Sequence, residues 1–522
     1  MNLSELLFGS PAVPTDVADL TDPVVYAGES TWTRAELQAR ADALAATLTG
    51  LGIGPGRSVG VMLPNTADPV AALFGTWRAG GIYVPLNPRL TATELAAILE
   101  GVTPAVVVTT ADHVDRFGGY PVVVAEPDGW SVVPGSGSGT ASVASDQVHD
   151  LDVALIQFTS GTTGTPKPVL LRHSGVLKLL DGVLAKLRSG SNSKSEKSGS
   201  TKSGSSDKTN SSPMPNLIPV SLSLWAGLYN VLFALRVDAP VVIMDGFEPH
   251  EFAALVRRFA IRSTVLPPAA MTMLADDESI TDLAPLRFVR SITAPLSPLQ
   301  ARRFKDRFGI AVLNSYGQTE IGGEIVGWNA ADSRAFGETK LGSVGRPHDG
   351  VEVRVVDGEL WVLTPALSAG YADGTDLSDR LSPDGWFRTG DFGRVDDEGF
   401  VWIEGRVSSM INRGGLKIAP GEVEEVIRLH PAVADVAVAG VADERLGEVP
   451  WAFVVQRGMN SAVEDLVDEA ELEDLCRQHL APYKVPVRFV SIAALPRNEV
   501  GKVLLRDLIS LAATAGEGGG QP

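Results

Sequence analysis

The chain has 522 residues but a single cysteine, Cys476. One thiol cannot form an internal disulfide bond, and it cannot supply a metal site built from several thiolates. No apolar run approaches the length of a membrane span. The first twenty residues also lack a basic segment followed by an apolar one. These absences predict a protein of the reducing cytoplasm, with no signal or transit peptide and no integral membrane segment.

Positive charge is also scarce, because 44 Lys and Arg stand against 63 Asp and Glu, giving a formal net charge of -19. Such a balance disfavours nonspecific binding to nucleic acid or to anionic lipid. A phosphorylated ligand would therefore have to be held by a local site, against the average field of the protein. The length and the 44% of hydrophobic residues predict a globular chain of two or more domains.

Helical and strand patterns alternate in the first part of the chain. TWTRAELQARADALAATLTGLG (31–52) opens on a Thr cap and closes on Gly, as a helix does. RSVGVMLPN (57–65), AVVVTT (105–110) and DVALIQFTS (152–160) are typical of buried strands. Strands separated by helices indicate βαβ units and largely parallel sheets.

Two stretches interrupt this pattern. Residues 189–216, SGSNSKSEKSGSTKSGSSDKTNSSPMPN, have almost no apolar side chains, which predicts a flexible, exposed insertion. Its four lysines leave contact with a polyanion as an alternative. Near Arg406 a β-rich unit gives way to helix and strand patterns, for example PGEVEEVIRLHPAVADVAVAGV (420–441), which predict a compact α+β domain. The Gly-rich end of the chain, residues 511–522, is expected to be disordered.

The stretch FTSGTTGTPK (158–167) combines hydroxyl groups, glycines and a terminal lysine. It lacks the GxxxxGK[ST] order of a P-loop. It follows a predicted strand and precedes a helical pattern, HSGVLKLLDGVLAKL (173–187), so we expect it at a helix start, where anions are favoured. Its hydroxyl and N–H groups could wrap phosphate oxygens, although an ordinary loop has the same composition.

Four later stretches strengthen the phosphate interpretation. They are SYGQTE (315–320), WFRTGDFG (386–393), GRVSSMINRGGLKIAPGEVE (405–424) and PRNEVGK (496–502). Each taken alone is compatible with a turn that carries a solvated charge. All five in this order resemble the core motifs of the adenylate-forming superfamily: acyl- and aryl-CoA ligases, adenylation domains of peptide synthetases, and luciferases.

The resemblance implies an α/β fold with a large N-terminal domain of βαβ-type sheets plus a β-rich subdomain, residues 1–405. A small mobile α+β domain, residues 406–510, follows it, with the ATP site in the cleft between the two. The expected substrates and cofactors are a carboxylic acid, ATP, Mg²⁺ and CoA, with no nucleic acid. A carboxylate attacks the α-phosphorus of ATP, so the enzyme mainly positions anions and neutralises charge.

Site residues follow from the positions that match the motifs. The resemblance implies that ATP is bound by eleven residues: Thr159, Ser160, Gly161, Thr162, Thr163, Gly164, Lys167, Tyr316, Gly317, Asp391 and Arg406. It implies catalytic roles for Glu320, which also binds magnesium, and for Thr319, Lys417 and Lys502. Gly414 and Gly415 would line the CoA tunnel, with Gly415 allowing close backbone approach; a plain β-turn is the alternative.

The acid is expected to be hydrophobic. The acyl pocket is predicted at Trp225, Leu228, Tyr229, Thr293 and Ala294, although such residues are also ordinary core. Ser221 stands where peptide-synthetase domains have the Asp that binds an α-amino group. An unpaired ammonium in an apolar pocket is costly, so a fatty, alicyclic or aryl acid is favoured over an amino acid.

Two departures from the family pattern leave alternatives open. Ser408 occupies the hinge position that usually holds Asp or Lys, and the segment IPVSLSLWAGL (218–228) lacks the usual histidine. A carrier protein could replace CoA as the acceptor, as in acyl-AMP ligases. A protein that binds nucleotide or acyl-adenylate with impaired turnover is the third possibility.

Overall fold

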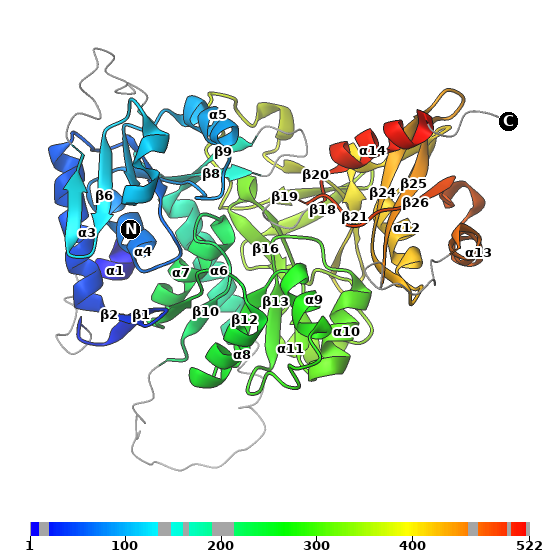
Figure 1. Cartoon of the computed structure of the whole chain (residues 1–522), viewed down its shortest axis with the longest axis horizontal. Helices are drawn as coiled ribbons and strands as arrows, with labels where there is room; N and C mark the ends of the chain where they lie inside the picture. Colours follow the sequence, from blue (N-terminus) through cyan, green and yellow to red (C-terminus); the bar gives the residue numbers. More distant parts are fainter. Residues whose placement is uncertain are drawn as a thin grey trace, which may run out of the picture.

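The computed structural model describes residues 2–9, 20–133, 148–159, 166–189, 213–457, 468–497 and 503–517. Sheets of the N-terminal part occupy the left and centre of Figure 1, and the C-terminal part lies at the right. The fold is of the mixed α/β type that the sequence predicts, with a large N-terminal and a small C-terminal part. Within the described ranges, no helix is long and apolar enough to cross a membrane.

The largest sheet has seven strands, whose central members are parallel and whose edges are antiparallel. Its order is β7 (Gly129–Val132), β6 (Val122–Glu126), β5 (Val106–Thr109), β3 (Ser58–Met62), β4 (Ile82–Pro85), β8 (Val153–Thr159) and β9 (Lys167–Arg172). The crossovers contain α4 (Asp68–Arg78), α5 (Ala92–Val102) and the short helix η1 (Ala111–Phe117). β3, β4 and β5 are buried along their whole length, as expected of strands covered on both faces.

A second sheet packs beside it and contains the first two described strands of the chain. Its order is β10 (Asn216–Ile218), β11 (Val241–Ile243), β1 (Pro23–Ala27) and β2 (Ser30–Thr33). The predicted Thr cap is confirmed: Thr33 forms a reciprocal capping box with Glu36 at the start of α3 (Arg34–Gly50). The accompanying helices are α1 (Glu5–Phe8), α6 (His173–Ser189), α7 (Trp225–Arg236) and α8 (Pro249–Arg258).

Three smaller sheets lead to the C-terminal part. A parallel one contains β12 (Ser263–Leu266), β13 (Phe288–Ser291) and β14 (Ala311–Leu313), with α9 (Pro268–Asp276) and α10 (Pro298–Phe308). An antiparallel one contains β15 (Ser315–Gln318), β16 (Gly323–Gly327) and β17 (Arg346–Pro347), with η3 (Thr319–Ile321) and α11 (Ala330–Phe336). The predicted β-rich unit is a meander of β18 (Glu352–Val356), β19 (Glu359–Leu363), β20 (Phe387–Val395) and β21 (Val401–Arg406), with η4 (Ser378–Arg380) before β20.

The C-terminal sheet has its own buried clusters, formed by residues 411–508. Its strands are β22 (Ile411–Arg413), β23 (Leu416–Ile418), β24 (Val433–Asp443), β25 (Gly447–Gln456) and β26 (Arg488–Ser491). Its helices are α12 (Pro420–Ile427), α13 (Glu469–His479), η6 (Pro482–Lys484) and α14 (Leu505–Glu517), and η5 (Val407–Ser409) connects it to β21. A separate core is what an independent domain needs, while the exact boundary at residue 406 stays a prediction.

Three sequence predictions need correction. The loop after β8 does not lead into a helix: β9 pairs antiparallel with β8 from Lys167 onward, and α6 begins only after β9. The predicted insertion is shorter, because Ser189 belongs to α6 and Asn216 to β10. The predicted disordered tail is helical through Glu517, since α14 is anchored by Leu508, which is fully buried beside Phe453. Residues 518–522 lie outside the described chain.

The close crossing of α3 and α4 yields a stability prediction. A Cβ atom at Gly75 would lie 2.7 Å from the Ala41 carbonyl oxygen and 3.1 Å from the Leu44 Cβ. Gly75→Ala should therefore force the helices apart and lower the free energy of unfolding by about 1–3 kcal/mol. Gly101→Ala on α5, where no heavy atom lies within 4 Å of the new Cβ, is the matched control; it should be neutral or gain about 0.5–1 kcal/mol. Urea unfolding of both variants decides, and equal effects would contradict the steric account.

Candidate active site

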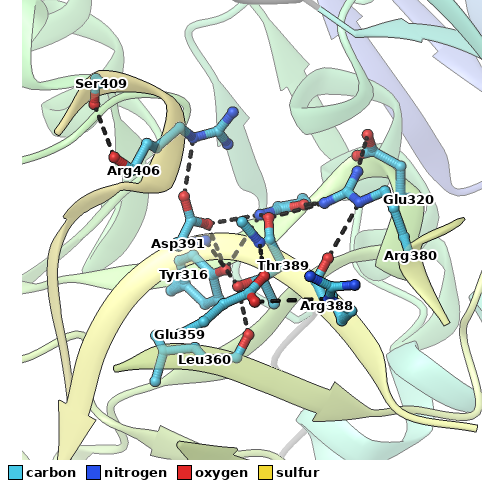
Figure 2. A network of polar contacts seen from close by, with 12 residues as sticks. Tyr316, Glu320, Glu359, Leu360, Arg380, Arg388, Thr389, Asp391, Arg406 and Ser409 are labelled. Carbon is cyan, nitrogen blue, oxygen red and sulfur yellow. Dashed lines mark hydrogen bonds and ion pairs between the residues drawn. The ribbon is translucent and has the colours of Figure 1, made fainter. Parts of the chain in front are cut away.

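The motif SYGQTE folds as β15 followed by η3, paired with β16. Gly317 lies so close to β16 that a Cβ would clash with the Gly323 carbonyl oxygen. The register shifts between Tyr316 and Gly317. This tight pairing places Tyr316, Gln318 and Glu320 within one polar network with residues of β20 (Figure 2).

Asp391 is the centre of this network. It lies in β20 opposite Arg406 of β21, and its side chain is only 4% exposed. Its Oδ1 pairs with the Arg406 Nε at 2.9 Å, and its Oδ2 accepts hydrogen bonds from the Tyr316 hydroxyl and the Gln318 Nε2, each at 2.6 Å. Burial and the neighbouring Asp391 carboxylate raise the pKa of Tyr316 well above its usual value, so the phenol stays a donor.

Arg380, at the end of η4, links Glu320 to Gln318, which in turn bonds to Asp391. Its Nη1 pairs with Glu320 Oε1 at 3.1 Å, and its Nη2 donates to Gln318 Oε1 at 3.2 Å and to the Thr389 carbonyl at 2.8 Å. Its Nε donates to the Arg388 carbonyl at 3.1 Å. Figure 2 shows the guanidinium between Glu320 and Thr389. The guanidinium of Arg380 therefore holds Glu320 on one side and Gln318 and the Thr389 carbonyl on the other.

Glu320 Oε1 also accepts a hydrogen bond from the Tyr371 hydroxyl, at 3.3 Å. The Nζ of Lys167 lies 5.2 Å from the centre of the Tyr371 ring. Lys167 is paired with Thr159 across the β8–β9 hairpin, so one flank of the predicted phosphate loop, Lys167, lies beside this network. Ser160, Gly161, Thr162, Thr163 and Gly164 lie outside the described residues.

The predicted CoA segment is a two-residue hairpin turn between β22 and β23. Gly414 and Gly415 have φ of 59° and 89°, which favour glycine. The alternative reading as a β-turn thus describes the local structure, and no described atom lies within 4 Å of a Cβ at Gly415. Positive φ by itself requires glycine there, and close approach to the CoA arm stays a prediction. The Nζ of Lys417 lies 4.9 Å from the centre of the Phe392 ring, next to Asp391.

The predicted hinge residue, Ser408, and the predicted adenylation lysine, Lys502, both follow β21. Ser408 is exposed within η5, and the neighbouring Ser409 hydroxyl donates to the Arg406 carbonyl at 3.3 Å. Lys502 lies outside the described residues. Its flanks, Arg497 and Val503, form an antiparallel bridge in the C-terminal part. The roles of hinge and adenylation lysine stay predictions.

Of the predicted acyl residues, some belong to the core. Leu228 is 1% exposed within the main hydrophobic cluster. Trp225 packs edge-on against Tyr229 and donates its Nε1 to the Gly322 carbonyl at 2.8 Å. Thr293 has a φ of 70°, and Ala294 follows it with its N–H donated to the Ile292 carbonyl. Ser221 hydrogen-bonds to Ser223 and presents no charge for an α-amino group.

A buried charge cluster, which the sequence did not indicate, lies beside these residues. Glu324 of β16 pairs with Arg290 of β13, and its Oε1 is 3.0 Å from the His348 Nε2. Although burial opposes ionisation, Arg290 and the hydrogen bond from His348 lower the pKa of Glu324 to about 2. Lys186 donates to the carbonyls of Gly327, Arg346 and Pro347, and burial lowers its pKa to about 8.

The sequence missed these residues for a common reason. Arg290, Glu324, His348, Tyr371 and Arg380 are dispersed along the chain, and none has a neighbour pattern that differs from a solvated charge or an ordinary strand residue. Gln318 was within a recognised motif but received no role. Only the tertiary fold brings these side chains together.

The Arg290–Glu324 pair should be important for stability, because both side chains are largely buried, at 18% and 12% exposure. Arg290→Met leaves a buried carboxylate without its main countercharge and should cost about 3–5 kcal/mol. Arg394→Met removes a surface pair with Glu404, whose side chains are about half exposed, and should cost under about 1 kcal/mol. Urea unfolding compares them, and similar losses would refute the burial argument.

Comparison with known proteins supports the motif assignment. The AMP-binding enzyme family matches residues 16–372, and the AMP-binding enzyme C-terminal domain matches residues 422–502. The 3-[(3aS,4S,7aS)-7a-methyl-1,5-dioxo-octahydro-1H-inden-4-yl]propanoyl:CoA ligase of Mycobacterium tuberculosis is 32% identical, over 92% of this chain and 94% of the relative. The sulfoacetate–CoA ligase of Cupriavidus necator is 31% identical, over 90% and 91%.

Solved structures show the same fold. The crystal structure of ATP-bound MatB from Rhodopseudomonas palustris superimposes with a TM-score of 0.81 at 26% identity, covering 98% of this chain and 99% of that one. The family matches, the curated relatives and the shared fold agree with one another. The chain therefore belongs to the AMP-binding enzyme family of the adenylate-forming superfamily, in the branch of AMP-forming acid:CoA ligases.

Proposed function

We propose that this enzyme activates a hydrophobic carboxylic acid, of fatty, alicyclic or aryl type, and transfers it to CoA. Adenylation of an acid with ATP, followed by thioester formation with CoA, is the reaction of its family branch. The finer assignment concerns the acid and the residues that act on it. One observation carries the assignment of these residues: the network in which Asp391, Glu320 and Arg380 link the motifs SYGQTE and WFRTGDFG, with Lys167 of β9 beside it.

In this proposal Asp391 holds the ribose hydroxyls. Both of its oxygens are already engaged, by Arg406 on one side and by Tyr316 and Gln318 on the other. Arg406 is 42% exposed, so it can shift and leave Oδ1 to a hydroxyl group while Tyr316 keeps Oδ2 in place. Tyr316 and Gly317 then lie beside the base, as the family resemblance implies.

Magnesium fits this site through a single carboxylate. In the part of the chain that the structure describes, no three His, Cys, Asp or Glu side chains gather as a metal cage. Glu320 engages Arg380 and Tyr371 through Oε1, and its Oε2 makes no hydrogen bond to a described residue. Mg²⁺ commonly binds one or two carboxylates together with substrate phosphates. When bound, it would neutralise charge on the departing phosphates.

The remaining residues position the reacting groups. A carboxylate oxygen of the acid attacks the α-phosphorus, the bond to the bridging oxygen breaks, and pyrophosphate leaves. Lys167 and the loop 159–164 would hold the β- and γ-phosphates, Thr319 would contact phosphate, and Lys502 would bridge the carboxylate and the leaving oxygens. In the second step the CoA sulfur attacks the acyl carbon, AMP leaves and the thiol proton is released.

The acid class rests on Ser221 and on the apolar residues near α7. Ser221 bonds to Ser223 and supplies no carboxylate for an ammonium group, and Trp225 and Leu228 offer apolar surface. The two relatives are named for chemically different acids, a bicyclic propanoate and sulfoacetate. Their names therefore do not select the acid for this chain. We further propose a cytoplasmic location and rotation of the C-terminal domain about Ser408 between the half-reactions.

The reaction is tested by pyrophosphate release from ATP and Mg²⁺ across fatty, alicyclic and aryl acids, with and without CoA. We expect many turnovers with CoA and a hydrophobic acid, and only a stoichiometric burst without it. Lys502→Ala should reduce adenylation by at least about 100-fold, because it removes a charge aligned with the transition state. A burst that CoA fails to relieve would favour a carrier-protein acceptor, and no release with any acid would favour the binding protein.

Arg380 supplies a second prediction. Arg380→Met releases Glu320 and Gln318 together and should lower kcat/KM for ATP by about 10–100-fold. It should also lower the Mg²⁺ concentration needed for half-maximal rate, because the metal no longer shares the Glu320 carboxylate with a second positive charge. Arg380→Lys should recover less than half of the lost kcat/KM, because a single ammonium group cannot replace the several N–H donors of the guanidinium. The control is Arg394→Met on β20, which removes the exposed pair with Glu404. An unchanged Mg²⁺ requirement would show that Arg380 acts only on stability.

A further inference from the structure

We propose that Tyr229 and Arg290 form a subsite for an uncharged oxygen at the distal end of the acid, so that the substrate is a keto- or hydroxy-substituted hydrophobic acid. This inference rests on the proposed function, since it places these residues at the acyl end of the same site. It goes further by naming the polar group that the acid carries and the side chains that recognise it.

The Tyr229 hydroxyl is the first observation. It is buried from solvent, yet it makes no hydrogen bond to any residue that the structure describes. A buried hydroxyl without a partner loses its bonds to water and gains nothing in return. Proteins keep few such groups, so this hydroxyl needs a partner that the described residues do not supply.

The location of Tyr229 is fixed by its neighbour one turn earlier. Trp225 stacks edge-on against the Tyr229 ring and bonds to the Gly322 carbonyl, which leads directly into Gly323 and β16. A Cβ on Gly323 would lie 2.6 Å from the Trp225 Nε1, so helix and strand are in close contact. Burial, together with the charge of Glu324, raises the pKa of Tyr229, which keeps its proton available for donation.

Thr293, in the loop that follows β13, gives an independent indication. Its Oγ1 is also buried without a hydrogen-bond partner among the described residues, and its backbone has a φ of 70°. A β-branched residue rarely adopts this conformation, and such strain is found most often at functional sites. Two of the predicted acyl residues, from separate elements, thus present unsatisfied hydroxyls.

Arg290 supplies the remaining donors. Only its Nη1 has a partner among the described residues, Glu324, while its side chain stays 18% exposed. Its other N–H groups are therefore available to an acceptor. Facing this pair are His348, Lys186, and the more distant Asp332 and Arg346, which pair with each other.

The charge balance selects a neutral group over an anion. Glu324 already compensates Arg290, and Lys186 spends its N–H groups on three carbonyls. A distal carboxylate or sulfonate would have to displace Glu324 and bury it without its countercharge, which is costly. A carbonyl or hydroxyl oxygen requires only hydrogen bonds from Tyr229 and Arg290.

The test compares cyclohexylpropanoate with its ring-keto, ring-hydroxy and ring-carboxy derivatives, by CoA-dependent pyrophosphate release. We expect wild-type kcat/KM to be at least about tenfold higher for the keto or hydroxy acid than for the parent acid. Tyr229→Phe should erase this preference by lowering the value for the oxygenated acid about tenfold, with the parent acid unchanged. Tyr26→Phe, in β1 of another sheet, is the control and should leave the preference intact.

The outcomes separate the two proposals. Efficient use of the parent acid, with no effect of Tyr229→Phe on the ratio, would overturn the subsite and leave the ligase assignment intact. Preference for the ring-carboxy acid would overturn the neutral oxygen in favour of an anion on Arg290. Failure of every acid in the wider panel would remove the proposed function and the subsite with it. Because the wild-type ratio is measured first, the test does not depend on the variant folding.

Discussion

A single buried carboxylate organises this site. Asp391 draws Tyr316 and Gln318 from one sheet and Arg406 from the next strand of its own sheet. Burying a charge is costly unless several donors compensate it, so the carboxylate can exist only where both motifs are correctly folded. Without it, the two sheets would present unrelated polar side chains, and the nucleotide site would have no fixed centre.

The same physical constraint explains the position of Arg380. Glu320 is 9% exposed and needs a countercharge when no cation is bound. Arg380 supplies it, and the remainder of its fork is fixed by Gln318 and the Thr389 carbonyl. Arrival of Mg²⁺ with ATP would bring a second positive charge to the same carboxylate. Arg380 thus stabilises the site before the nucleotide binds, and its positive charge lowers the affinity of Glu320 for the metal.

Much of the fold could be predicted from sequence, because the signals are local. The Thr33 cap and the buried strands β3, β5 and β8 lie where composition and period place them. β9 was missed because Lys167 and Pro168 resemble the end of a loop. Proline is tolerated there since β9 is the edge of its sheet. The motifs located Asp391 and Glu320, but Arg380, Arg290 and Glu324 reach the site through side-chain contacts between elements far apart in the sequence, which no local pattern encodes.

The pairing of Asp391 with Arg406 has a consequence for the chain beyond it. Arg406 is the last residue of β21, and the first strand of the C-terminal sheet begins five residues later, at Ile411. If ribose hydroxyls replace Arg406 at Asp391, nucleotide binding breaks the ion pair that holds the start of the segment 406–411, which connects β21 to the C-terminal sheet. By thermodynamic linkage, whatever orientation of that sheet draws Arg406 away must tighten nucleotide binding by the same factor. Nucleotide binding and the orientation of the C-terminal sheet are then thermodynamically coupled.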